Sequence, residues 1–108
     1  MTVNGLLEGG DFKALSLVEG EREISGVYIG DLLSWVMGKA KSGDAWITIM
    51  SNVNILAVAA LTDCACIILS EGVTLTEEIT RTAKAKGINV LTFSGSSYDA
   101  AVSLEKLL

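Results

Sequence analysis

The stretch Ala45–Leu69 reads AWITIMSNVNILAVAALTDCACIIL, and it decides the fold. It begins with a strand-like run, Ala45–Met50, passes through a polar loop into an apolar helix, Ile55–Leu61, and ends in a second strand, Ala65–Leu69. The second strand lacks polar alternation, which is typical of a strand buried on both faces of a parallel sheet. Strand, helix and strand in this order predict a βαβ unit.

The same alternation continues on both sides of this unit. Upstream, we expect Asp31 to cap a helix that stops near Lys41. Downstream, either Thr74, in a capping box with Glu77, or Thr76 starts a helix that ends at Gly87. The other predicted elements are a helix over 2–8, strands over 14–18, 24–29 and 89–93, and a helix over 98–107.

These elements predict an α/β protein with three layers, α/β/α, around a mostly parallel sheet of four to five strands. A chain of 108 residues has room for one domain, residues 1–108. Residues 1–23 either add an edge strand or cover one, so the strand order stays open.

Several classes of enzyme are excluded by what the sequence lacks. It contains no His, so it has no Ser-His-Asp triad, no Cys-His dyad and no HExxH zinc helix. The P-loop pattern GxxxxGK[ST], the GxGxxG fingerprint and the GxSxG elbow are also missing. We therefore expect no kinase activity, no catalytic residues and no cofactor.

The charge pattern limits the partners. The formal net charge is -5 and the basic residues are scattered, so nucleic-acid binding is not expected. The first residues do not resemble a signal peptide, and the most apolar stretch, 45–62, is interrupted by Ser51, Asn52 and Asn54. We expect a soluble, cytoplasmic protein without membrane contact.

The loops that follow the predicted strands are the candidate ligand site. Ligands of parallel sheets bind beyond the carboxyl ends of the strands, against helix N-termini. Small or polar residues there suit a small anionic ligand or a nucleotide, although the same residues also cap helices and shape turns. The candidates are Gly30, Asp31, Ser51, Asn52, Asn54, Ser70, Glu71, Gly72, Ser94, Ser96 and Ser97.

The predicted helix after Asp31 carries an unusually apolar set of residues: Leu33, Trp35, Val36 and Met37. Core packing explains such a set, and so does an interface with another subunit, because Trp and Met are enriched at interfaces. The second interpretation predicts a homo-oligomer, most simply a dimer.

Cys64 and Cys66 are the only cysteines. In an extended strand both point to the same face, together with Ile68, as two small core residues. The alternative is a redox pair or a metal site, but no other Cys and no His is present to complete a metal site. No metal is therefore expected.

The order of these segments resembles the DRTGG domain family, which is also similar to the N-terminal domain of HPr kinase/phosphorylase. The resemblance covers nearly the whole chain. Where the family has a Gly-Asp-Arg-like loop, this chain has Met50–Asn54, and the T-G-G-like turn is Ser70-Glu71-Gly72. The segments that carry the resemblance are ISGVYIGDLLSWVM (24–37), GDAWIT (43–48), CIILSEG (66–72), AKAKGINVL (83–91) and SSYDAA (96–101).

The resemblance implies a stand-alone regulatory module that binds a ligand or a protein partner and has no kinase activity. Two alternatives remain from the sequence. One is a small cysteine-dependent redox or metal-linked protein, and the other is a structural subunit of a larger complex, for example a hydrogenase-related one.

Overall fold

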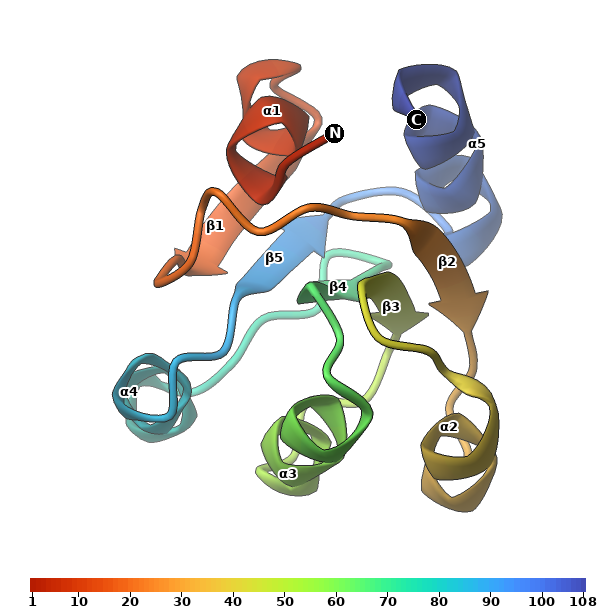
Figure 1. Ribbon diagram of the computed structural model, residues 1–108. Coiled ribbons are helices and arrows are strands. Elements are labelled where there is room, and N and C mark those ends of the chain that lie inside the picture. Colours follow the sequence, from red (N-terminus) through yellow and green to blue (C-terminus); the bar gives the residue numbers. More distant parts are fainter.

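The computed structural model describes residues 1–108 as five strands and five helices around one sheet (Figure 1). The strands are β1 (Phe12–Ser16), β2 (Gly26–Ile29), β3 (Asp44–Thr48), β4 (Cys66–Leu69) and β5 (Val90–Phe93). The helices are α1 (Val3–Glu8), α2 (Leu33–Lys39), α3 (Asn54–Thr62), α4 (Glu77–Ala85) and α5 (Ser97–Leu107). No helix has both the length and the apolar character needed to cross a membrane.

The strand order in the sheet is β1-β5-β4-β3-β2. The four strands from β2 to β5 are parallel, whereas β1 pairs antiparallel with β5. The N-terminal segment therefore adds an edge strand, which settles the alternative that the sequence left open. Because β2, β3, β4 and β5 follow one another in space, their crossover helices α2, α3 and α4 all lie on one face of the sheet (Figure 1). Helices α1 and α5 cover the other face, which confirms the three-layer α/β/α prediction.

The core has two halves, one on each face of the sheet, because successive strand side chains point to opposite faces. Trp46 and Ile67 pack toward α2, α3 and α4, while Ile47 and Ile68 pack toward α1 and α5. All the residues of β3 and β4 are buried, so these strands form the centre of the sheet. The apolar runs Ala45–Ile47 and Cys66–Leu69 within them follow from burial on both sides.

Most element starts differ from the sequence prediction by one or two residues, and two of the differences bear on the site. Strand β1 begins at Phe12 instead of residue 14, and Phe12 pairs with Phe93 in β5. Asp31 does not cap α2, which begins at Leu33 after Leu32 with no side-chain cap. Instead, Asp31 Oδ1 accepts hydrogen bonds from Thr48 Oγ1 at 2.7 Å and from the Ile49 N–H at 3.1 Å. The acid therefore joins the ends of β2 and β3.

The start of α4 resolves the two alternatives for its cap. Thr76 is the N-cap, and its Oγ1 accepts a hydrogen bond from the Ile79 N–H at 3.2 Å. The helix ends before Gly87, which has the positive φ (73°) that a glycine after a helix commonly adopts.

Candidate ligand-binding site

The carboxyl ends of β2, β3, β4 and β5 lie along one edge of the sheet because these strands are parallel. The antiparallel strand β1 starts at the same edge, where Phe12 pairs with Phe93. The residues just before β1, Gly10 and Asp11, therefore join the loops that follow the parallel strands.

The chain leaves β4 and β5 in opposite directions. The loop after β4 leads to α4 on one face of the sheet, and the loop after β5 leads to α5 on the other face (Figure 1). Two backbone hydrogen bonds tie these loops together: the Glu71 N–H donates to Gly95 O at 2.7 Å, and the Gly72 N–H donates to Phe93 O at 2.9 Å. Glu71 and Gly72 both have positive φ, 59° and 70°, which produces the tight turn that this pairing needs.

A cavity of about 390 Å³ opens beside these loops. Phe93 is its one hydrophobic lining residue, and the cavity draws on β1, on the β4–α4 loop, on β5 with its following loop, and on α5. Its lining residues are Gly10, Asp11, Lys13, Gly72, Thr74, Thr92, Phe93, Ser94, Gly95 and Asp99.

The charged groups of this cavity are Asp11, Lys13 and Asp99. Asp99 lies in the first turn of α5, where a carboxylate is favoured by the helix dipole, and its N–H donates to Ser96 Oγ at 3.0 Å. No ion pair joins Lys13 to either acid. One ammonium and two carboxylates are thus available to a ligand.

Two of the predicted ligand residues, Gly72 and Ser94, line this cavity. Four others, Ser70, Glu71, Ser96 and Ser97, lie in the adjoining loops or at the start of α5 and help to build it. Ser96 caps α5, and the hydroxyls of Ser70 and Ser97 share a hydrogen bond of 2.7 Å.

The remaining predicted residues lie at the ends of β2 and β3 and do not line the cavity. Gly30 O accepts a hydrogen bond from Trp46 Nε1 at 2.9 Å, and Asp31 binds the end of β3. Asn52 Oδ1 accepts from the Asn54 N–H at 2.9 Å, next to Ser51. These contacts are those of residues that shape turns and strand ends.

The sequence prediction missed most of the residues that line the cavity. Gly10, Asp11 and Lys13 reach it only because β1 pairs with β5, and no local pattern shows that pairing. Gly95 and Asp99 could have been found, because they flank Ser96 in the loop and helix that were already singled out.

The two cysteines lie on opposite sides of the sheet, so the prediction that they share a face is wrong. Cys66 belongs to the half of the core next to α1 and α5, whereas Cys64 precedes β4 and packs against the other half. Burial raises the pKa of Cys66 to about 12 and also raises that of Cys64. Both thiols are therefore protonated near neutral pH, which suits neither redox chemistry nor metal binding.

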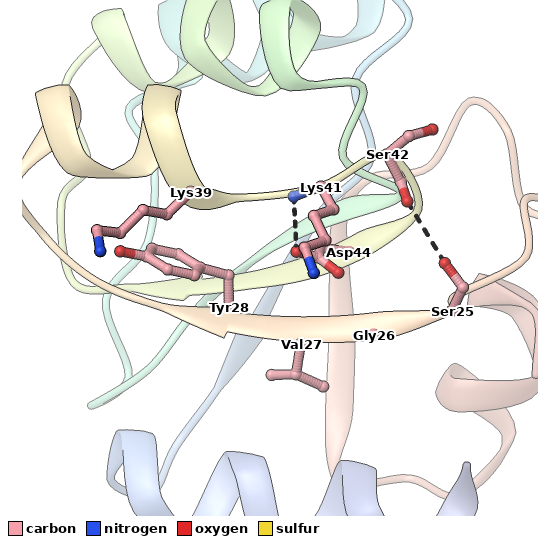
Figure 2. Close-up of a pocket in the computed structure, with 8 residues that line it drawn as sticks. All are labelled: Ser25, Gly26, Val27, Tyr28, Lys39, Lys41, Ser42 and Asp44. Atoms are coloured by element: carbon pink, nitrogen blue, oxygen red, sulfur yellow. Dashed lines mark hydrogen bonds between the residues drawn. The ribbon is translucent and has the colours of Figure 1, made fainter.

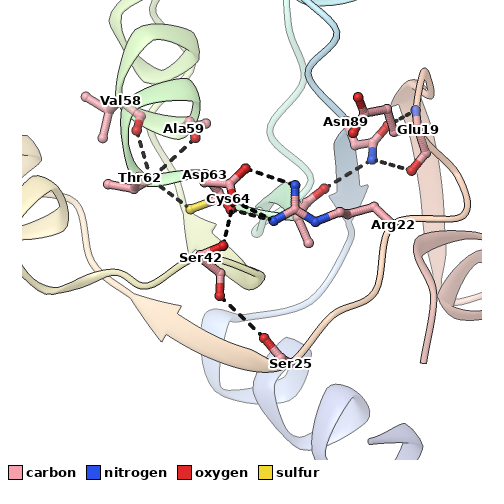
Figure 3. Close-up of polar contacts among 11 residues, drawn as sticks. Glu19, Arg22, Ser25, Ser42, Val58, Ala59, Thr62, Asp63, Cys64 and Asn89 are labelled. Atoms are coloured by element: carbon pink, nitrogen blue, oxygen red, sulfur yellow. Dashed lines mark hydrogen bonds and ion pairs between the residues drawn. The ribbon is translucent and has the colours of Figure 1, made fainter.

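A polar network occupies the opposite, amino edge of the sheet (Figure 3). The Arg22 guanidinium donates to both carboxylate oxygens of Asp63, each at 3.0 Å, and to its backbone carbonyl at 2.9 Å. The Ser42 hydroxyl donates to the same carboxylate. These hydrogen bonds lower the pKa of Asp63 and raise that of Arg22. The network ties the β1–β2 connection to the end of α3 and holds no free charge for a ligand.

The apolar residues of α2 do not form one surface. Val36 is fully buried against the sheet, and Leu33 is partly buried beside it. Trp35 and Met37 are exposed, but at 100° per residue they lie on opposite flanks of the helix relative to Val36. An interface would therefore use one flank and would exclude Val36.

Comparison with known proteins agrees with this geometry. The family model described as the DRTGG domain matches residues 13–107. A solved structure of the CBS and DRTGG domains of the regulatory region of Clostridium perfringens pyrophosphatase, complexed with the activator diadenosine tetraphosphate, superposes with a TM-score of 0.73 at 20% identity. The alignment covers 95% of this chain and 45% of that one, so the chain spans less than half of that relative. No curated protein sequence matches. With the family model covering most of its length, the chain belongs to the DRTGG domain family.

Proposed function

We propose that this chain is a regulatory module that binds a nucleotide at the cavity beside β1 and β5 and catalyses no reaction. The observation that carries this proposal is the divergence of the loops after β4 and β5 to opposite faces of the sheet. Crevices at such a point are the usual ligand sites of open parallel sheets. The cavity of about 390 Å³ lies at this point.

The lining groups suit a nucleotide better than a simple anion. Two carboxylates, Asp11 and Asp99, would repel an isolated phosphate, but they can accept hydrogen bonds from ribose hydroxyls. Lys13 can attract a phosphate group. A Cβ at Gly95 would lie 2.8 Å from the Phe93 ring and 3.4 Å from Asp99 Oδ2, so glycine avoids a clash with two side chains that line the cavity.

The relative of known structure supports the choice of ligand class. That regulatory region was solved with diadenosine tetraphosphate, and it contains a DRTGG domain together with CBS domains. Nucleotides, including dinucleoside polyphosphates, are therefore the first compounds to test. The proposed lack of catalysis rests on the missing His and P-loop.

Isothermal titration calorimetry tests this proposal with diadenosine tetraphosphate, ATP, AMP and inorganic phosphate. We expect at least one nucleotide to bind without turnover, and inorganic phosphate to bind more weakly. Lys13→Gln and Asp99→Asn should each weaken nucleotide binding about three- to tenfold. The controls Lys106→Gln and Glu105→Gln, on the exposed end of α5, should bind as the wild type does. Absence of heat with all four compounds, or equal losses in the controls, would contradict the proposal.

Self-association of the chain stays a prediction, as does similarity to the N-terminal domain of HPr kinase/phosphorylase. Exposed apolar side chains on α2 are compatible with a dimer that uses one flank of that helix. Sedimentation velocity at micromolar concentration measures the oligomeric state directly.

A further inference from the structure

Strand β2 has a free edge. It is the last strand of the sheet, and it pairs with β3 on one side only. Beyond its end, the Gly30 N–H donates to Ile47 O in β3 at 3.1 Å. Alternate residues of a strand bond to the same side, so Tyr28 also faces β3, while the backbone groups of Val27 and Ile29 face outward.

Strand β2 is only four residues long, and its sequence carries none of three common blocks to further pairing. Sheet edges are normally blocked by a bulge, a proline or a charged side chain. The residues of β2, Gly26–Ile29, include no proline and no charge, and they pair with β3 in unbroken register. An edge of this kind is a template on which another strand can add.

A groove of about 440 Å³ runs along this edge on the side of α2 (Figure 2). Ser25, Tyr28, Lys39, Lys41 and Ser42 line it, and the ammonium group of Lys39 lies toward the Tyr28 hydroxyl in Figure 2. Lys39 Nζ also lies 5.1 Å from the centre of the exposed Trp35 ring, which is outside the groove.

The groove is locally basic in an acidic protein. Neither Lys39 nor Lys41 forms an ion pair. The one carboxylate in the groove, Asp44, is 8% exposed and accepts a hydrogen bond from the Lys41 N–H at 2.8 Å. The exposed charges that line the groove are thus two lysines, although the whole chain carries a net charge of -5.

We propose that the free edge of β2 binds an extended acidic peptide of a partner protein by strand addition. Backbone groups of Val27 and Ile29 would pair with the peptide, and acidic side chains on its α2 side would meet Lys39 and Lys41. Charge complementarity selects this occupant, because the rest of the protein repels an acidic segment. The site is separate from the nucleotide cavity, so either proposal can fail without the other.

Fluorescence anisotropy tests the proposal with a short labelled peptide of alternating glutamate and valine and with its lysine and valine counterpart. We expect the acidic peptide to bind and the basic one not to bind. The double variant Lys39→Glu/Lys41→Glu should weaken binding tenfold or more. Lys84→Glu/Lys106→Glu, which changes the net charge equally on α4 and α5, should leave it within about twofold.

A second pair of variants tests strand addition itself. Ile29→Pro removes an outward N–H without touching the ladder to β3, and it should abolish binding. Ile29→Thr keeps that N–H and should bind as the wild type does. Circular dichroism and urea denaturation check that both variants are folded. Equal binding of the two peptides, or unchanged binding by a folded Ile29→Pro, would overturn the proposal. A dimer that sedimentation detects and Ile29→Pro dissociates would also overturn it, because a second copy would then occupy the edge.

Discussion

The two edges of the sheet are built differently. Strand β1 carries Lys13 and a register shift between Ala14 and Ser16, which are both features that block further pairing. Strand β2 carries neither, and its residues pair with β3 without a break. One edge of this sheet is therefore closed by its own sequence, while the other is left available.

The segments beyond the two strands repeat this contrast. After β1 the chain is anchored by Asn89, which is 3% exposed and makes four hydrogen bonds. Its Oδ1 accepts from the N–H groups of Val18 and Glu19, and its Nδ2 donates to Glu19 O and Ala65 O. Beside β2, by contrast, the polar side chains mostly face solvent. The β1 edge is therefore stabilised by buried hydrogen bonds, whereas the polar groups beside the β2 edge are accessible to a partner.

The largest effect that we predict is at the anchored edge. Asn89→Ala should lower the free energy of unfolding by about 3 kcal/mol, because it leaves buried backbone groups without partners. Urea denaturation at neutral pH measures the loss. Asn52→Ala, which removes one local hydrogen bond at an exposed turn, is the control and should lose under about 1 kcal/mol. If Asn89→Ala lost no more unfolding free energy than Asn52→Ala, backbone pairing alone would hold β1.

A smaller effect is predicted at the open edge. A Cβ at Gly26 would lie 2.6 Å from Asp44 Oδ1, and the Lys41 N–H holds that carboxylate in place. Gly26→Ala should therefore destabilise the protein by about 1–2 kcal/mol. Gly38→Ala is the matched control: a Cβ at Gly38, inside α2, has no neighbour within 4 Å, so it should stabilise by about 0.5–1 kcal/mol. The same sign for both substitutions would contradict this account of the β2 edge.

The central strands of the sheet could be predicted from the sequence, whereas the pairing of the edge strand β1 could not. The apolar runs at Ala45–Met50 and Ala65–Leu69 contain β3 and β4, because burial on both faces leaves a local signature. The pairing of β1 with β5 joins residues far apart in the chain and leaves none. This explains why Gly10, Asp11 and Lys13 were missed as site residues.

Two other sequence predictions, the shared face of the cysteines and the Asp31 cap, are wrong for different reasons. Asp63 adopts a left-handed conformation, with φ of 58°, and ends α3. Strand β4 therefore begins only at Cys66, and Cys64 escapes the strand alternation that would have placed both thiols on one face. Asp31 looked like a cap because it precedes α2, but Thr48 and Ile49, which are distant in sequence, use its carboxylate.

The contact between Arg22, in the β1–β2 connection, and Asp63, at the end of α3, should make the free energy of unfolding depend on pH. Arg22 lowers the pKa of Asp63 in the folded protein, whereas in the unfolded chain this carboxyl has its ordinary pKa of about 3.9. The stabilisation is therefore complete well above pH 4, and it is lost as the pH falls through the lower pKa of the folded state.

Urea denaturation from pH 7 to pH 2.5 measures this dependence. Asp63→Asn removes the titrating group and suits the left-handed backbone, so its stability should fall less on acidification than that of the wild type. Glu105→Gln, at an exposed site without an ion pair, should follow the wild-type curve. Parallel curves for Asp63→Asn and the wild type would show that the Arg22 contact does not stabilise the attachment of the β1–β2 connection to the end of α3.

The smallest effect is predicted for Trp35, whose size would suggest the opposite. Trp35 is 61% exposed, whereas Trp46 is fully buried and donates to Gly30 O. Trp35→Ala should change the free energy of unfolding by no more than about 0.5 kcal/mol, while Trp46→Phe should cost several times more, because it empties part of the core and orphans a carbonyl. Urea denaturation measures both, and acrylamide should quench Trp35 fluorescence preferentially.

A large loss of unfolding free energy in Trp35→Ala would mean that α2 needs this side chain for folding. A negligible loss would leave a large aromatic residue beside the open edge with no part in stability, as expected of a group kept for contact with another molecule.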